Sequence, residues 1–315
     1  MAIGNQCSHL GKCAMNATAT CFHTSISCGD EMNDPDHDMS GTVDNEELAE
    51  AYNHALALEK AGRRDEAVAA WHKVLQIDPA DHGGAAIRLA ALGAAPPPKR
   101  MPDAYVETLF DQHAMAFDDI LVDQLGYAVP LMLAAALREQ APGPHERGLD
   151  LGCGTGLTGA ALDGMVKTMI GLDISEEMVA LSEERDCYDG LYVAEAEDFL
   201  ESIGDEEAPF DLIVATDVLP YIGDVSRLFA GIAAKVTNRA VIGFSTESFE
   251  AGAGQGELGE GGYRVLPSHR YAHTAAYVEA ELCAAGFEPI HREEIIVRME
   301  KNEPARGHLF LARKA

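Results

Sequence analysis

Residues 149–156 (LDLGCGTG) carry the residue types that can hold a ligand against the main chain. Gly152, Gly154 and Gly156 stand at alternate positions after a short apolar stretch. Glycine can adopt a positive φ, and its missing Cβ lets a ligand lie directly on the backbone. The following residues, 157–162, can begin a helix, whose N-terminus offers unpaired N–H groups and a partial positive charge. The segment therefore predicts a strand, a turn and a helix that bind a ligand together.

The spacing of the glycines and of one acid narrows the kind of ligand. A dinucleotide-binding segment has the pattern G-x-G-x-x-G, whereas this one has G-x-G-x-G, with Asp150 two residues before the first glycine. The string closely resembles the first motif of class I S-adenosylmethionine-dependent methyltransferases. Because the G-x-x-G spacing of dinucleotide-binding segments is missing, an NAD-linked oxidoreductase is disfavoured. By itself, the glycine run also fits an ordinary strand-to-helix turn.

A second motif follows at the distance that such a nucleotide-binding unit requires. Residues 168–175 (TMIGLDIS) have the pattern of an apolar strand that ends in Asp173, 21 residues after Gly152. At this position a Rossmann-like unit places a carboxylate on ribose hydroxyls. The alternative is that Asp173 or Ser175 caps the next helix. With both motifs in register, the methyltransferase interpretation is favoured.

The resemblance implies a fold class, a cofactor and a reaction. The fold is α/β, a Rossmann-like seven-stranded, mostly parallel sheet with helices on both faces, preceded by a small all-α TPR-like helical hairpin. The cofactor is S-adenosyl-L-methionine, whose sulfonium makes its methyl group an electrophile, while the protein supplies position for in-line attack. The residues to which the resemblance assigns cofactor binding are Asp150, Gly152, Cys153, Gly154, Gly156, Asp173, Ile174, Met178, Glu195, Ala196 and Thr216.

Glu195 departs from the pattern of that family. After the third predicted strand, relatives usually carry Gly-Asp-Ala, whose Asp accepts a hydrogen bond from the adenine amino group. Residues 194–196 are Ala-Glu-Ala here, so Glu195 can accept the same bond through a side chain that is one methylene longer. The alternative for Glu195, Glu197 or Asp198 is a solvated acid after a strand.

Residues 210–215 predict a buried strand, with Thr216 and Asp217 at its carboxyl end. Ligands of open α/β sheets bind at that edge. The resemblance implies that the Thr216 backbone lines the methionine moiety, and that Asp217 with Tyr221 faces the methyl acceptor. Alternatively, Asp217 caps the segment after the strand and Tyr221 packs in the core.

A further polar cluster, Arg270, Tyr271 and His273, lies where class I enzymes insert substrate-binding elements. Arg270 could clamp an anionic acceptor such as a carboxylate through its planar fork, and Tyr271 is a further substrate-binding candidate. If the acceptor must lose a proton, His273 or Asp217 is the candidate base. The alternative for His273 is a histidine on the surface or satisfied in the core. The Gly- and Glu-rich stretch 247–262 predicts a surface loop.

The region before the glycine-rich segment predicts a helical lid on a methyltransferase domain at 102–315. Residues 105–130 resemble the N-terminal lid of bacterial TPR-containing predicted methyltransferases, a resemblance that covers residues 46–315. In many class I relatives an aromatic–Asp pair, here Phe117 and Asp118, sits over the cofactor. Alternatively, the aromatic residues of this region have only the core spacing of amphipathic helices.

Residues 39–94 form a predicted helical segment, which a stiff Pro-rich linker at 95–101 separates from that domain. Gly62 in a turn, Trp71 and Pro79 have the spacing of one tetratricopeptide repeat. One repeat cannot bury its own apolar face, so this unit should pack on the catalytic domain or on another chain. It is either a plain helical hairpin or a site for a protein partner. In the second case, the chain could be a cofactor-binding interaction protein without turnover.

Residues 1–38 have no sustained period and predict either a disordered tail or an over-called start, with true initiation at Met39. The four cysteines of this stretch are spaced too widely for the paired ligands of zinc sites. Residues 36–47 have the oxygen-ligand spacing of an EF-hand calcium loop, but no entering helix precedes them. The same residues contain a helix capping box, from Asp44 to Glu47. Calcium binding stays open here, and we assign no metal site.

The overall charge limits the possible partners. The formal net charge is −29, from 52 acidic against 23 basic residues, without a cluster of Lys and Arg. Such a surface repels phosphate backbones, which disfavours nucleic acid. No window has an apolar run that could span a bilayer, and the first 30 residues lack the core of a signal peptide. We therefore expect a cytoplasmic protein that acts on a small-molecule methyl acceptor.

Overall fold

Seven strands form one sheet in the order β3-β2-β1-β4-β5-β9-β8. The computed structural model describes residues 45–204, 209–249, 261–300 and 302–315. The strands are β1 (His145–Leu151), β2 (Val166–Asp173), β3 (Gly190–Val193), β4 (Phe210–Ala215), β5 (Val236–Glu247), β8 (Phe287–Glu300) and β9 (Glu303–Lys314). Neighbours from β3 to β5 pair in parallel, whereas β9 is antiparallel to both β5 and β8. The predicted Rossmann-like, mostly parallel sheet is therefore confirmed.

Helices cover both faces of this sheet, as expected for strands that are apolar on both sides. One core packs β1, β4 and β5 against α8 (Ala196–Ser202), α9 (Ser226–Ala234) and α10 (Ala275–Ala284). On the opposite face a second core contains residues of α5 (Val129–Gln140), and partly buried residues of α6 (Leu157–Ala161) pack against it. The remaining helix of this region, α7 (Glu176–Glu183), contacts β2 and β3.

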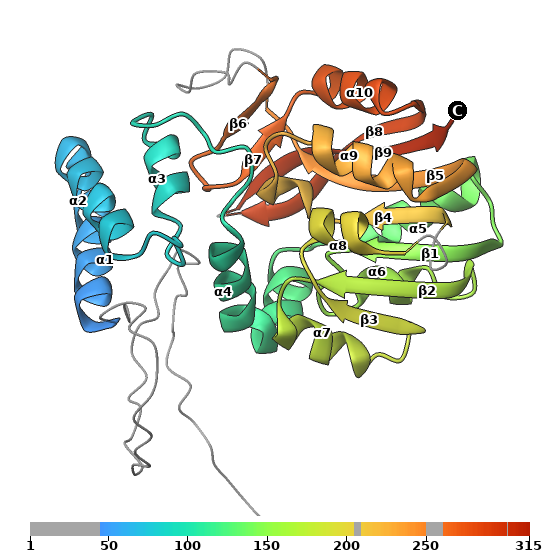
Figure 1. Ribbon diagram of the computed structural model, residues 1–315, viewed down its shortest axis with the longest axis horizontal. Coiled ribbons are helices and arrows are strands. Elements are labelled where there is room, and N and C mark those ends of the chain that lie inside the picture. The colour runs from blue at the N-terminus through green and yellow to red at the C-terminus, as the bar shows by residue number, and fades with distance from the viewer. Residues whose placement is uncertain (1–44, 205–208, 250–260, 301) are drawn as a thin grey trace, which may run out of the picture.

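The carboxyl ends of the parallel strands face the lid. In Figure 1 the arrows of β1 and β2 point toward α4 (Asp103–His113). A 3-10 turn, η1 (Ala114–Ala116), and a π-helix, η2 (Asp119–Gln124), follow α4. The lid predicted within residues 105–130 is thus a run of short helical pieces. Such a break in helical geometry is frequent at functional sites.

A small two-stranded sheet lies beside the main one. It pairs β6 (Tyr263–Val265) with β7 (Tyr271–His273) in antiparallel register. The sequence does not predict this hairpin, because its strands of three residues are too short to show an alternating pattern. Glu247 was expected to begin a surface loop, but it ends β5 and is 2% exposed. Of that expected loop, residues 250–260 lie outside the described part of the chain.

The N-terminal helices are α1 (Asn45–Lys60), α2 (Arg64–Ile77) and α3 (Ala85–Ala91). Trp71 is fully buried between them, and its indole Nε1 donates to Glu59 Oε2 at 2.8 Å. The guanidinium of Arg88 lies 4.9 Å from the centroid of the Trp71 ring. These contacts stabilise a helical unit that is small for an independent domain.

This unit packs on the rest of the chain, which was one of the two expected ways to cover its apolar face. Ile87 of α3 shares a buried cluster with Met101 and with Tyr271 of β7. The tetratricopeptide interpretation and the predicted domain limits stay predictions. The possible calcium loop up to residue 44, the four N-terminal cysteines and the question of the start all lie outside the described residues. Among the helices described, none is both long and apolar enough to cross a membrane.

Candidate functional site

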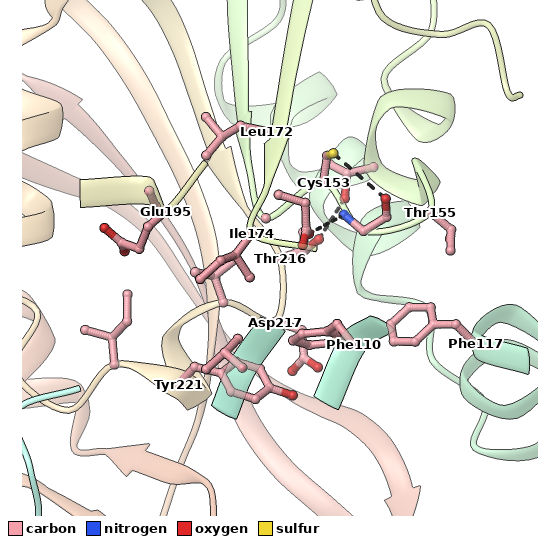
Figure 2. A pocket seen from close by; sticks show the side chains of 18 of the residues that line it. Phe110, Phe117, Cys153, Thr155, Leu172, Ile174, Glu195, Thr216, Asp217 and Tyr221 are labelled. Atoms are coloured by element: carbon pink, nitrogen blue, oxygen red, sulfur yellow. Dashed lines mark hydrogen bonds between the residues drawn. The ribbon is translucent and has the colours of Figure 1, made fainter. Parts of the chain in front are cut away.

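A cavity with about 940 Å³ of empty space, open to solvent at its mouth, lies at the carboxyl ends of β1, β2 and β4, under α4 and η2 (Figure 2). Ligands of open α/β sheets bind at this edge of the sheet. The predicted site residues that line it are Gly152, Cys153, Gly154, Asp173, Ile174, Glu195, Ala196, Thr216, Asp217 and Tyr221. The predicted site residues that do not line it are Asp150, Gly156, Met178, Arg270, Tyr271 and His273. The structure therefore brings together most of the cofactor set and only part of the acceptor set.

The glycine-rich turn forms one wall. Gly152, Gly154 and Gly156 have φ values of +66°, +54° and +88°, which only glycine adopts without strain. A Cβ on Gly152 would lie 2.5 Å from Val218 Cγ2, so that position also has no room for a side chain. A Cβ on Gly154 would have only Phe117 in reach, at 4.0 Å. Gly154 therefore leaves bare backbone open to the cavity.

Asp173 lies at the end of β2 and faces the cavity. Its carboxylate accepts hydrogen bonds from the backbone N–H groups of Gly154, at 2.9 Å, and Ser175, at 3.0 Å. Burial raises the pKa of Asp173, and these backbone donors oppose that rise. The helix cap is supplied by Ser175, whose Oγ accepts from Met178 N at 3.1 Å. Asp173 is thus left to fix the glycine turn and to offer its remaining lone pairs to a ligand.

Asp150 does not contact the cavity; it supports the glycine turn from behind. Its Oδ2 accepts a hydrogen bond of 2.6 Å from the Tyr188 hydroxyl, which accepts one of 3.1 Å from Gly159 N. Burial raises the pKa of Asp150 to about 7, although the Tyr188 hydrogen bond opposes the rise. Any part of Asp150 in ligand binding is therefore indirect. No sequence pattern pointed to Tyr188, because it lies in a loop outside both motifs.

Glu195 is the N-cap of α8, and among the described contacts only one of its two carboxylate oxygens is occupied. Oε2 accepts from Asp198 N at 2.9 Å and lies 3.0 Å from Nη1 of Arg100. Oε1 has no hydrogen-bond partner among the described residues, and it does not belong to the buried polar atoms that lack a partner. Glu195 is thus a helix cap with one oxygen left for a ligand, rather than merely a solvated acid.

Arg270 joins three elements at the far side of the cavity. Its Nη2 donates to Asp217 Oδ1 at 2.7 Å, Nη1 to the Tyr221 hydroxyl at 2.6 Å, and Nε to Glu247 Oε1 at 2.5 Å. Arg298 also donates to Glu247 Oε1, at 2.7 Å. Burial alone would raise the pKa of Glu247, but Arg270 and Arg298 lower it below its ordinary value.

These contacts contradict the prediction that Arg270 clamps an anionic acceptor. All three guanidinium nitrogens already bond to this chain, and Arg270 does not line the cavity. The groups that do reach the cavity are Asp217 and Tyr221. Asp217 has a φ of +60°. Such strain in a non-glycine residue is typical of functional sites.

His273 is contradicted as a base, because it is fully buried and away from the cavity. Its Nε2 donates toward the carbonyls of Ile222, at 2.9 Å, and Gly223, at 3.1 Å. Burial lowers the pKa of His273 to about 4, so the ring is neutral near pH 7. Tyr271 is equally buried, and its hydroxyl donates to Pro98 O at 2.6 Å. Both residues hold β7 against its surroundings, in line with the alternative of a core histidine. Only Nε2 of His273 is satisfied, because its Nδ1 is buried without a hydrogen-bond partner among the described residues.

The lid closes the cavity with aromatic rings. Phe110 lies 6.0 Å from Phe117 and 5.2 Å from Tyr221, measured between ring centroids in edge-to-face geometry. Asp118 accepts a hydrogen bond of 2.6 Å from Thr155 Oγ1 and also pairs with Arg185. In Figure 2, Glu195 lies at one end of the cavity and Phe117 at the other. The cavity is thus elongated, with an acid at one end and the glycine turn and lid at the other.

The fold and this cavity define a Rossmann-like enzyme with a nucleoside cofactor site. A family model described as a methyltransferase domain matches residues 125–292, which is more than half of the chain. The chain belongs to this methyltransferase family, and the recognition made from the two sequence motifs is confirmed.

Individual relatives are more distant. The ubiquinone biosynthesis O-methyltransferase of Azorhizobium caulinodans is 29% identical over 179 residues, which cover 54% of this chain and 66% of that protein. The chain thus spans slightly less than two thirds of the length of this curated relative. The N-methyltransferase NodS from Bradyrhizobium japonicum WM9, in complex with S-adenosyl-L-homocysteine, superposes with a TM-score of 0.51 at 13% identity, over 66% of this chain and 98% of that chain. At this identity the superposition shows the fold alone.

Proposed function

We propose that the protein is an S-adenosyl-L-methionine-dependent methyltransferase that acts on a small-molecule acceptor. One observation carries the proposal. Gly154 leaves bare backbone at the cavity wall, and its backbone N–H is held by a hydrogen bond to the cavity-facing carboxylate of Asp173. This pair gives a nucleoside both a surface without side chains and an acceptor for ribose hydroxyls. The bound cofactor supplies a methyl group on an electron-poor sulfonium.

The residues that would hold the cofactor follow the length of the cavity. Glu195 and Ala196 bind the adenine end, Asp173 and Ile174 the ribose, and the glycine turn with Thr216 the methionine end. In Figure 2, Ile174 lies between Glu195 and Cys153 of the glycine turn, in agreement with this order. Asp150 acts through the turn that it supports, and Met178, which is fully buried in α7, acts only through packing.

The acceptor binds between the lid and the end of β4. Phe110, Phe117 and Tyr221 supply an aromatic wall, and Asp217 supplies a carboxylate. Electron-rich ring faces stabilise a nearby cation such as a sulfonium. Asp217 is also the remaining candidate base, if the acceptor must lose a proton. Since methyl transfer depends on position, the main task of this wall is to hold the acceptor in line with the methyl group.

Binding and turnover test this proposal separately. Calorimetry should detect binding of S-adenosylmethionine and of its product S-adenosylhomocysteine. Asp173→Ala should lower the affinity for both at least tenfold, because charge-assisted hydrogen bonds to ribose are lost. Asp163→Ala, a change of the same kind at an exposed turn, serves as the control. Incubation with a methyl-labelled cofactor and a metabolite extract should then give a labelled small molecule. No binding by the intact protein, or undiminished affinity of Asp173→Ala, would refute the site.

The N-terminal helical unit leaves a second role open. A protein partner of α1 and α2 stays a prediction, and an interaction protein without turnover is the alternative function. The turnover assay separates the two, because only an enzyme releases labelled product. A cytoplasmic location is part of the same proposal, since Cys153, Cys187 and Cys283 are free thiols, as is usual in a reducing compartment.

A further inference from the structure

Residues 98–101 belong to the predicted linker, yet they are fixed along the methyltransferase domain. The Lys99 carbonyl accepts a hydrogen bond of 2.8 Å from Gly223 N, and Met101 N donates to Tyr221 O at 2.9 Å. Met101 is 2% exposed. A flexible spacer would leave these backbone groups to water. This segment instead has one position relative to the cavity.

The segment places Arg100 in the cavity wall, next to Glu195. Nη1 of Arg100 lies 3.0 Å from Glu195 Oε2 and 3.5 Å from Glu197 Oε2, and Nη2 lies 3.0 Å from Asp103 Oδ2. Burial lowers the pKa of Arg100, but Glu195 and Asp103 raise it above its ordinary value, so the charge is retained. Arg100 therefore neutralises a group of acids that would otherwise repel one another.

The contact with Arg100 also fixes which oxygen of Glu195 is available. Oε2 is occupied by the Asp198 backbone N–H and by Arg100, from two directions. Oε1 is left without a described partner. A carboxylate held in this way keeps one lone pair in a fixed place for a donor, which lowers the entropy lost when the donor binds.

We propose that Arg100 is a positioning residue for purine recognition. This inference rests on the proposed function, in which the cofactor is S-adenosylmethionine. Arg100 orients the Glu195 carboxylate, which in turn accepts a hydrogen bond from the 6-amino group of adenine. It makes the linker to the N-terminal helices part of the cofactor site. Without this guanidinium, the Glu195 carboxylate has only the Asp198 N–H to orient it. Arg227, which pairs with Glu197 Oε2 at 3.0 Å, then remains as a counter-charge for the neighbouring acids, but none of its described contacts reaches Glu195. A site that depends on a hydrogen bond from the ligand discriminates strongly against an analogue that lacks the donor.

The test compares two nucleosides that differ at this one position. S-adenosylhomocysteine carries the 6-amino donor, whereas S-inosylhomocysteine carries a carbonyl acceptor there. Calorimetry should show that the intact protein prefers the adenosine form. Arg100→Gln should weaken S-adenosylhomocysteine roughly tenfold and S-inosylhomocysteine much less, so that the preference falls by a similar factor. Arg100→Lys, which keeps the charge, should recover part of it.

The control is Lys99→Gln, in the same segment, because the Lys99 side chain is exposed and, within the described part of the chain, forms an ion pair only with Asp224. Its preference should equal that of the intact protein. An unchanged preference in Arg100→Gln, with normal binding by the intact protein, overturns this inference alone. An equal loss for both nucleosides would show a merely structural role and overturn it as well. Failure of the intact protein to bind either one overturns the proposed function, and this inference with it.

Discussion

The two halves of the cavity use their polar groups in opposite ways. In the cofactor half, the glycine turn, Asp173 and Glu195 are positioned by the protein but keep free capacity toward the cavity. In the acceptor half, all three guanidinium nitrogens of Arg270 bond to the chain, and Glu247 Oε1 accepts from both Arg270 and Arg298. Of the predicted acceptor residues, Asp217 and Tyr221 reach the cavity. The polar groups of the cofactor half thus keep acceptors for a ligand, whereas those of the acceptor half bond mainly to one another.

This difference bears on the charge of the acceptor. Arg270 was the one cation predicted for an anionic acceptor, and it is neutralised by Asp217 and Glu247. The wall that remains is aromatic and bears one carboxylate. An anionic acceptor would meet no free positive charge from Arg270 and would face Asp217. We therefore propose an uncharged or apolar acceptor, for which aromatic walls supply most of the binding free energy.

Removing Arg270 should have the largest effect on stability and little effect on cofactor binding. Arg270→Met leaves Asp217 without its ion-pair partner and Glu247 with Arg298 alone. An uncompensated buried charge, here that of Asp217, costs about 3–5 kcal/mol. We expect urea unfolding to show a loss of that order. The affinity of the folded fraction for S-adenosylhomocysteine should change less than threefold.

Arg292→Met is the matched control, because Arg292 pairs with Glu279 at the surface, at 46% and 36% side-chain exposure. Surface pairs contribute about 0–1 kcal/mol, so this variant should unfold almost as the intact protein does. If Arg270→Met lowered the cofactor affinity more than tenfold, the two halves would be coupled and the comparison above would be wrong.

The parts proposed for the cofactor half can be identified in the sequence, because each of them is local. Each of its main parts is a short strand followed by a turn or an acid, and each can be identified within ten residues. The parallel order of the strands then brings these ends to one edge of the sheet. Glu195 was identified in the same way, from its position after β3.

The contacts of the acceptor half could not be predicted from the sequence in this way, because they join residues that are far apart along the chain. Arg270, Tyr271 and His273 are adjacent in sequence, but the β6–β7 hairpin turns Tyr271 and His273 into the core and Arg270 toward Glu247. The pairing of Arg270 with Asp217 spans 53 residues. The cofactor half has one such contact too, because the pairing of Arg100 with Glu197 spans 97 residues. Neither pairing has a pattern that a single sequence shows.

A side chain on the glycine turn should act on the cofactor half alone. Gly152→Ala forces a non-glycine residue to φ +66° and places a Cβ 2.5 Å from Val218 Cγ2. The left-handed backbone alone costs roughly 1–2 kcal/mol. We expect the turn to relax away from the cavity and the affinity for S-adenosylhomocysteine to fall at least tenfold in calorimetry. Gly190→Ala is the control, because its Cβ would lie 3.8 Å from Tyr192. Equal affinities of the two variants would show that the turn does not contact the cofactor.

The smallest effect should come from His273, and it should depend on pH. Burial lowers the pKa of His273 to about 4 in the folded protein, against about 6.5 in an unfolded chain. Its neutral form thus contributes stability that is complete above pH 6.5 and is lost as the pH falls toward 4, because the unfolded state binds the proton first. Between pH 6.5 and pH 5 this amounts to about 2 kcal/mol.

His273→Gln can still donate to the carbonyls of Ile222 and Gly223, but it does not titrate. Its unfolding free energy, measured by urea titration at several pH values, should therefore fall by about 2 kcal/mol less than that of the intact protein between pH 6.5 and pH 5. At pH 8 both proteins should bind S-adenosylhomocysteine equally and give the same labelled product. Loss of methyl transfer in His273→Gln with cofactor binding retained would restore His273 as a catalytic base. It would also show that β7 opens to the cavity during turnover, in which case the acceptor half would not be the closed frame that its ion pairs indicate.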